Sequence, residues 1–297
     1  MPRIYLSPST QEYNAYYDGQ GSEEYYMNLI ADAMEPYLTA SGIAFTRNTP
    51  DMTAASSIRA SNEGTYDAHI ALHSNAAPES LSGQLRGADV YYDPNSMRSE
   101  QLAQIAAANL KSIYPVPTDV TTRPTDSLGE VTRTRAPAIL YEFAYHDNPA
   151  DAEWIRSNID AIARGVVLSL TEYFRIPFVE PQPIQTATVE VSSGNLNIRS
   201  APSLAAPVVG KAPDGAQLTV LGQYDGWYAV RYGDYEGFVW ATILCSITEA
   251  APHHCVCGAL RKFCPRILFR FLVIHQVLPR KRAASGCKIF SQIALAK

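Results

Sequence analysis

Apolar residues between positions 1 and 178 recur with two periods, one typical of helices and one typical of strands. Between Glu23 and Ala40 they recur at helical spacing, and Gly42 follows as a residue suited to end a helix. The same spacing predicts helices over Glu100–Ile113 and Pro149–Phe174. Short apolar runs predict strands over Arg3–Leu6, Ile43–Thr46, Ala68–Leu72, Ala88–Tyr92 and Ala138–Glu142, with a turn at His73–Ala76. This alternation predicts an α/β fold with a mostly parallel sheet flanked by helices.

The pattern changes after residue 178. Residues 179–187 (VEPQPIQTA) are rich in proline and predict a linker. Over residues 188–244, short β-type runs are separated by turn signals such as Pro213–Gly215 and Asp225–Gly226. These features predict a small all-β module, which we interpret as a barrel. We therefore expect domains at 1–178 and 188–244, followed by an irregular tail at 245–297.

Composition narrows the class of protein. The chain has 297 residues, of which 46% are hydrophobic and 18% charged, and these values exclude a mostly disordered protein. No run of about 18 apolar residues occurs, so we expect no transmembrane helix. The opening MPRIYLSPST has no apolar stretch of the kind found in signal peptides, so none is expected.

Charge and cysteine are concentrated in the tail. Residues 245–297 hold nine Lys or Arg against one acid, a net charge of +8, which leaves −13 on residues 1–244. Such an acidic body is poorly suited to nucleic acid, because phosphate contacts need a basic face. All five cysteines also lie in the tail, which excludes disulfides and a Cys nucleophile from the body.

The tail matches neither of the two patterns. We interpret it as a displaced reading frame or an unrelated fusion. Its segment HHCVCGALRKFC offers His and Cys side chains, but the C-x-C spacing is not that of common structural zinc sites. The run RILFRFLVI with basic flanks is the alternative, as a contact to a membrane surface.

Three ionisable residues stand where predicted strands end or helices begin. Glu23 opens the first helix, His73 follows the strand AHIAL, and Glu142 ends the strand AILYE. Open α/β sheets place their sites at such strand ends. One His and two Glu suit a catalytic Zn²⁺ with a separate general base. Structural alternatives are a helix-start carboxylate for Glu23 and a buried packing residue for His73.

Five segments of the first domain occur in an order that points to one family. They are EEYYMNLIADAMEPYLTASGIAFTR from Glu23, IRASN at 58–62, LHSNA at 72–76, GADVYY at 87–92 and APAILYEFAYHDN at 136–148. Together they make residues 3–174 resemble the zinc-dependent N-acetylmuramoyl-L-alanine amidases of the Amidase 3 type. The resemblance implies cleavage of the amide between N-acetylmuramic acid and the L-Ala of the stem peptide.

The resemblance also implies roles for single residues. Glu23 and His73 match zinc ligands, and Glu142 matches the catalytic Glu that activates water and protonates the leaving amine. One departure matters, because the family opens with D-P-G-H-G and Thr10 stands here at the position of the ligand His. We consider Gln11, Thr10 or water as the third ligand, and His146 as a relocated ligand or substrate contact.

Three further residues near these motifs are weaker candidates for a role in the site. His69 lies on the same strand face as His73 and is interpreted as supporting or packing. Arg133 and Arg135 precede the strand at Ala138 and either meet stem-peptide carboxylates or remain solvated.

The second domain carries its own set of motifs. LNIRSAPS, VVGKAPDGAQLTVL and GWYAVRYGDYEGFVWATIL occur in order within residues 188–244. They resemble the bacterial SH3-like modules of cell-wall proteins, with Trp227 and Trp240 filling or rimming the barrel. The resemblance implies binding to peptidoglycan, which would raise the effective concentration of substrate without changing the chemistry.

We therefore expect a monomeric, zinc-dependent peptidoglycan hydrolase that acts on the glycan strand and stem peptide. Holin-type release, or action from inside a mother cell, fits a chain for which no signal peptide is expected. The alternative is a non-catalytic wall-binding protein with a degenerate amidase fold, which the Thr10 departure favours. An aminopeptidase on a related fold is disfavoured, because no bridging acid of a two-metal site is visible.

Overall fold

The computed structural model of the protein describes residues 1–241 and 244–249. Its first sheet has the strand order β2-β1-β3-β6-β4-β5. All neighbouring strands in it are parallel except the pair β6 and β4, which is antiparallel. The mostly parallel sheet expected from the sequence is therefore confirmed. The strands are β1 (Arg3–Pro8), β2 (Ala44–Arg47), β3 (Ala68–Asn75), β4 (Ala88–Tyr92), β5 (Val120–Pro124) and β6 (Ala138–Tyr145).

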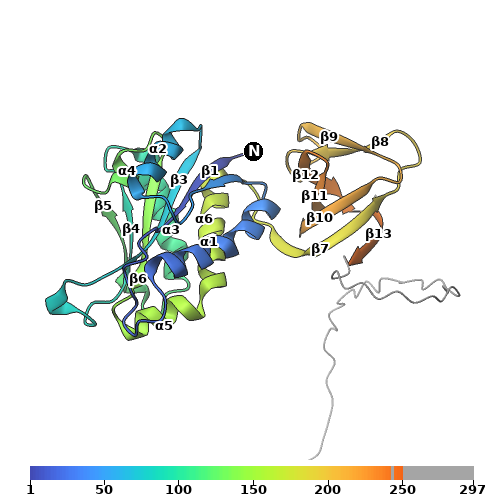
Figure 1. Cartoon of the computed structure of the whole chain (residues 1–297). Helices are drawn as coiled ribbons and strands as arrows, with labels where there is room; N and C mark the ends of the chain where they lie inside the picture. Colours follow the sequence, from blue (N-terminus) through green and yellow to red (C-terminus); the bar gives the residue numbers. More distant parts are fainter. Residues whose placement is uncertain (242–243, 250–297) are drawn as a thin grey trace, which may run out of the picture. The chain divides into compact units, whose positions relative to one another are not determined.

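Helices cover both faces of this sheet (Figure 1). One face packs its apolar side chains against α1, α3 and α6 in the main hydrophobic core. The other face lies under α2 and α4 and holds a smaller cluster of Ala71, Val131 and Leu140. The helices are α1 (Glu23–Ala40), α2 (Ala54–Glu63), α3 (Met97–Lys111), α4 (Gly129–Thr132), α5 (Pro149–Ser157) and α6 (Ile159–Phe174), with 3₁₀ turns at Glu79–Leu81 and Pro117–Asp119.

Strand pleating separates apolar from polar residues. In β3, Ile70 and Leu72 join the main core, whereas His69 and His73 point to the α2/α4 face. In β6, Ile139 and Tyr141 join the core, and Glu142 follows on the opposite face. The α2/α4 face therefore collects the ionisable side chains.

Several element boundaries differ from the sequence expectation. His73 lies within β3, not in a turn, because β3 continues its ladder with β6 to Asn75. The helix expected over Pro149–Phe174 is interrupted at Asn158, which ends α5 and begins α6. Strand β5 was not expected, since its short run VTTRP has only one buried residue.

The second sheet is antiparallel, with the order β13-β7-β10-β11-β12-β8-β9. Its inward-facing residues, among them Ile198, Leu218 and Val230, form a separate core. The expected turn at Asp225–Gly226 is present, and both residues have positive φ, as a two-residue hairpin requires. The strands are β7 (Glu180–Val189), β8 (Asn195–Arg199), β9 (Val208–Pro213), β10 (Gln217–Tyr224), β11 (Trp227–Tyr232), β12 (Tyr235–Trp240) and β13 (Leu244–Glu249).

Strand β7 occupies most of the segment that the prolines predicted to be a linker. Pro181 pairs with Gly222 beyond a register shift in β10, and Pro183 lies outside the paired positions of both neighbours. Prolines are tolerated at such irregular positions because no ladder N–H is needed there. Residues 245–249, expected in the tail, belong to β13. The interpretation of the tail from 250 onward lies outside the described residues.

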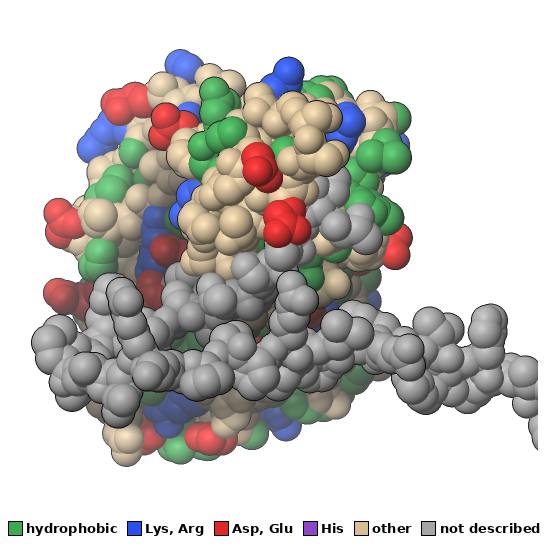
Figure 2. Space-filling view, turned by 90° about the vertical axis from the view of Figure 1, so that its right-hand side faces the viewer, with side chains coloured by type: hydrophobic (Ala, Val, Ile, Leu, Met, Phe, Trp, Pro, Cys, Tyr) green, Lys and Arg blue, Asp and Glu red, His purple; other side chains and the backbone are tan. Residues whose placement is uncertain are grey.

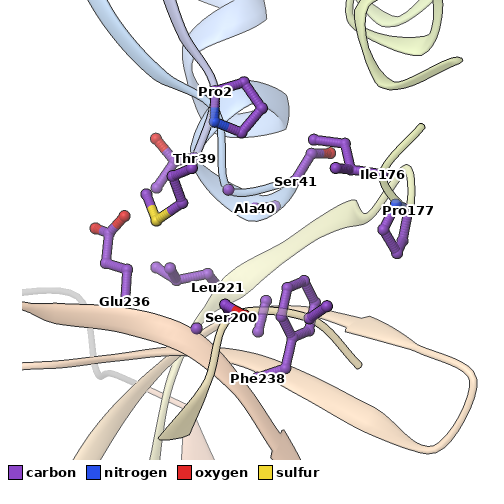
Figure 3. A pocket seen from close by; sticks show the side chains of 15 residues that line it. Pro2, Thr39, Ala40, Ser41, Ile176, Pro177, Ser200, Leu221, Glu236 and Phe238 are labelled. Atoms are coloured by element: carbon purple, nitrogen blue, oxygen red, sulfur yellow. The ribbon is translucent and has the colours of Figure 1, made fainter. Parts of the chain in front are cut away.

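Figures 2 and 3 show surface features apart from the α2/α4 face. On the face that Figure 2 presents, acidic, basic and hydrophobic side chains are interspersed. The pocket in Figure 3 is mostly apolar, with Ile176, Leu221 and Phe238 in its lining. It contains none of the His and Glu residues that the sequence selected. None of the helices in the described part is long and apolar enough to cross a membrane.

Candidate functional site

Strand register places three ionisable side chains in one row on the α2/α4 face. His73 of β3 is the neighbour of Glu142 in β6, and Glu142 is the neighbour of Asp89 in β4. Residues in register on adjacent strands point to the same face, so the row runs across three strands. After Glu142 the β3–β6 register shifts, and Ala144 takes a φ of 98°. This bulge turns the chain away just beyond the row.

Glu23 reaches the row from the start of α1. Ser22 caps that helix by accepting from the backbone of Tyr25, and Glu23 follows as the first helical residue, only 1% exposed. One carboxylate oxygen lies 2.7 Å from His73 Nδ1, and the other accepts from Asn14 Nδ2 at 2.6 Å. Burial would raise the pKa of Glu23, but these hydrogen bonds, first from His73, hold it below its usual value.

His73 is held through both nitrogens of its ring. Nδ1 faces Glu23, and Nε2 lies 3.0 Å from Oε2 of Glu130. Burial alone would lower the pKa of His73, but the hydrogen bonds to Glu130 and Glu23 outweigh it and hold that pKa well above its usual value. The two carboxylates therefore favour the charged form of the buried imidazole.

Glu130 is a site residue that the sequence did not reveal. It is buried in the four-residue helix α4, accepts from the Ser7 hydroxyl, and lies 3.4 Å from His69 Nε2 as well as against His73. Burial would raise its pKa, but the hydrogen bonds with His69 and His73 hold that pKa well below its usual range. No periodicity marks so short a helix, and no motif separated Glu130 from the chain's other acids.

Glu142 differs from the other two carboxylates. Its side chain is half-buried, and its Oε2 is a buried atom without a hydrogen-bond partner. Burial raises the pKa of Glu142 to about 8; the charge of His73 opposes this shift, and those of Glu23 and Asp89 add to it. A carboxyl that titrates near neutral pH can both take and give a proton, which is the property general acid–base catalysis needs.

A cavity of about 280 Å³ opens beside this arrangement. His73 and Glu130 line one side of it, and Thr10, Gln11 and Tyr13 come from the loop after β1. The lining also includes Met52 and Thr53, which precede α2. The cavity is therefore a place where a substrate could meet the buried histidine.

The other selected residues lie in different surroundings. His146 is buried, with Nδ1 3.0 Å from the carbonyl oxygen of Ser74 and its ring stacked on Tyr16. These contacts hold His146 against Ser74 and Tyr16, not against Glu23 or His73. His69 bonds Ser61 through Nδ1 and stacks on Tyr5, in keeping with a supporting role. Arg135 donates to the backbone of Asn62.

The donor groups do not fit the three-ligand zinc site that the family resemblance implied. Glu23 and His73 converge as expected, but Thr10 supplies no imidazole. Glu23 lies at Nδ1 of His73 and Glu130 at Nε2, on the opposite side of the ring, so Glu130 is not placed to be the third ligand. Within residues 1–241 and 244–249, no group of three or more His, Cys, Asp or Glu side chains is placed to hold a metal ion.

Comparisons with known structures agree with the fold. An N-acetylmuramoyl-L-alanine amidase from Clostridium difficile 630 matches with a TM-score of 0.53 at 17% identity, over 59% of this chain and 97% of that one. The catalytic domain of the amidase CwlV from Bacillus (Paenibacillus) polymyxa var. colistinus matches with a TM-score of 0.53 at 14% identity, over 60% and 100%. The CwlD amidase of Clostridioides difficile, solved with the GerS lipoprotein, matches with a TM-score of 0.51 at 15% identity, over 59% and 99%.

Family comparisons are more specific than these fold matches. Comparison with curated proteins yields no match. Residues 194–243 match the bacterial SH3 domain, in the all-β part of the chain. Residues 9–172 match N-acetylmuramoyl-L-alanine amidase, a family that is in general zinc-dependent. Because this match spans more than half of the chain, the protein belongs to the N-acetylmuramoyl-L-alanine amidase family.

Proposed function

We propose that this peptidoglycan amidase performs its reaction on the α2/α4 face, with Glu142 as the group that moves the proton. The observation that carries the proposal is the buried, unpartnered Oε2 of Glu142, in register with His73. An orphaned carboxyl oxygen is costly unless it serves a purpose. A bound water or substrate amide would supply its missing partner.

The reaction follows from the states that Glu142 can adopt. As a carboxylate, it takes a proton from water while the water oxygen bonds to the lactyl carbonyl carbon. The carbonyl oxygen becomes an oxyanion, which the positive charge of His73 stabilises electrostatically. The C–N bond then breaks, and Glu142 returns its proton to the L-Ala nitrogen. The pKa of about 8 makes both protonation states accessible near neutral pH.

Zinc dependence is the part of the family chemistry that the donor set of this chain does not support. Glu23 and His73 are the two residues that would contribute to a metal site, and the fit fails at the third ligand, where Thr10 supplies no imidazole. Thr10 in place of the ligand His also favours a second candidate, a wall-binding protein without catalysis. A measurement of amide hydrolysis distinguishes the two candidates.

The SH3 domain offers a groove suited to wall binding. Trp227 and Trp240 meet edge to face with ring centroids 5.1 Å apart, and Trp240 is 40% exposed. Asn197, Arg199 and Leu204 line the same groove of about 160 Å³. An exposed indole beside polar side chains can stack on sugar or pack on peptide while the polar groups hydrogen-bond. We propose peptidoglycan as its ligand.

The place of action follows from the substrate and is the cell wall. Monomeric state and the route of release were predicted from the sequence alone and stay predictions.

Replacing Glu142 with Gln should abolish amide hydrolysis while leaving binding to peptidoglycan intact. The amide side chain keeps the size of the carboxyl but cannot transfer a proton, so the rate should fall at least about a hundredfold. Release of L-Ala amino groups from purified peptidoglycan measures the effect, with the exposed Glu79→Gln as the control. Equal activity in parent and Glu142→Gln would contradict the role of Glu142. Inactivity of the parent as well would favour the wall-binding candidate.

The same variant should change how stability depends on pH. The pKa of Glu142 is raised from 4.5 to about 8 in the folded state, so the folded protein binds the proton more tightly than the unfolded chain. Parent stability should therefore decline as pH rises from about 4.5 to about 8, relative to Glu142→Gln. Thermal unfolding at several pH values measures this difference, with Glu79→Gln expected to parallel the parent. Parallel curves for parent and Glu142→Gln would refute the shift.

Replacing Trp240 with Ala should weaken wall binding at least about tenfold, because the exposed indole is a large part of the groove surface. Sedimentation of the full chain with purified peptidoglycan measures the retained fraction. Tyr235→Ala is the control, since Tyr235 is an exposed aromatic residue of the same domain that lies outside the groove lining. Equal losses in both variants would mean that the groove is not the contact.

A further inference from the structure

The side chain of Gln11 lies where the family resemblance would place a cation. Its Nε2 is 3.3 Å from Oε1 of Glu23 and 3.4 Å from Nδ1 of His73. These are the two groups that converge at 2.7 Å and that match ligand positions. The amide nitrogen therefore faces both members of the pair at once.

Neighbouring hydrogen bonds settle which end of the Gln11 amide faces the pair. Asn14 Nδ2 lies 2.6 Å from Oε2 of Glu23, so this atom is the amide nitrogen and donates to the carboxylate. The same Nδ2 lies 3.3 Å from Oε1 of Gln11, and the Tyr13 hydroxyl donates to that oxygen at 3.0 Å. The oxygen of Gln11 thus points to donors, and its N–H group points to Glu23.

The other side of the His73 ring is held as firmly. Glu130 accepts from Nε2, and its second oxygen accepts from Ser7. Because Glu23 and Glu130 lie at opposite nitrogens of one imidazole, no single ion can bind His73 and both carboxylates together. The two acids instead face the ring nitrogens of His73 and receive hydrogen bonds from N–H and O–H donors of Gln11, Asn14 and Ser7.

We propose that the amide of Gln11 replaces the metal ion of the family, so that the Glu23–His73–Glu130 clamp forms a metal-free variant of the amidase centre. Gln11 supplies the N–H donor that Glu23 needs, and the ring of His73 lies between Glu23 and Glu130, in register with Glu142. Glu130 acts as a positioning residue that holds the ring. Only the statement about activity rests on the proposed function; the absence of metal binding is tested independently.

The full-length protein should hold less than about 0.1 zinc per chain after incubation with zinc and dialysis. Gln11→Glu is the decisive variant, because it has the same shape but replaces the N–H donor by an acceptor. Beside Glu23 and His73, the new carboxylate completes a set of three donors, so we expect about one zinc per chain. Elemental analysis measures the metal, and the exposed Gln101→Glu serves as the matched control. Zinc should raise the melting temperature of Gln11→Glu alone.

Each outcome decides one part of the proposal. About one zinc per chain in the parent, lost in Glu23→Gln, would overturn the metal-free centre. No zinc in Gln11→Glu would overturn the role of the Gln11 amide. If the parent is active, a chelator should leave its rate of amide hydrolysis unchanged. Loss of activity on chelation that added zinc restores would contradict the metal-free centre. If the parent is inactive, the proposed function fails, while the zinc measurements still decide this inference.

Glu130→Gln tests the clamp from the other side. Loss of this carboxylate leaves His73 and His69 without their shared partner, so the melting temperature should fall by several degrees. Asp126→Asn makes the same charge change at an exposed position four residues away and should leave it unchanged. Zinc should restore neither stability nor activity to Glu130→Gln. Restoration of either by zinc would show that a metal, not the carboxylate, orders the site.

Discussion

The site depends on one buried imidazole held between two carboxylates. Glu23 and Glu130 approach His73 from opposite ring nitrogens, at 2.7 and 3.0 Å. Removing either acid would leave a buried charge without its partner, which is among the costliest changes a protein interior can suffer. The same pairing keeps Glu23 and Glu130 ionised and leaves Glu142 as the carboxyl whose pKa lies near neutrality. Electrostatic compensation thus separates Glu23 and Glu130, whose pKa values are lowered, from Glu142, whose pKa is raised.

The sheet makes this arrangement possible by separating its two faces. Apolar residues of β1, β3 and β6 pack under α1, α3 and α6, so that side of the sheet is closed by the main core. The opposite face receives His73, Glu142 and Asp89 at neighbouring register positions. Its covering helices α2 and α4 are short, and a cavity remains open beside His73. Because successive side chains of a strand point to opposite faces, the apolar residues are buried on one face and the ionisable residues lie on the face beside the cavity.

Family membership and the details of the donor set lead to different expectations about metal. The amidase family is in general zinc-dependent, whereas Thr10 and the orientation of the Gln11 amide favour hydrogen bonding over metal coordination. Proteins that share a fold can therefore differ in their chemistry, because activity depends on the side chains that surround the reacting atoms. Whether the amidase site binds a metal does not affect the groove of the SH3 domain, since that groove consists of residues of the SH3 domain itself.

The sequence by itself determined the α/β and all-β parts, most strands and helices, and the family. The roles of Glu23, His73 and Glu142 stay predictions. Periodicity and ordered motifs are local signals, so they can be recognised in the sequence without knowledge of the fold. Only the tertiary structure brought in Glu130, which is 57 residues from His73 and lies in a helix too short to show a pattern. The β-strand in the proline-rich segment likewise depended on partners 29 or more positions away, such as Gln217 opposite Thr188. The direction of the Gln11 amide was decided by Asn14 and Tyr13, because a hydrogen bond is set by the atoms that surround it in space.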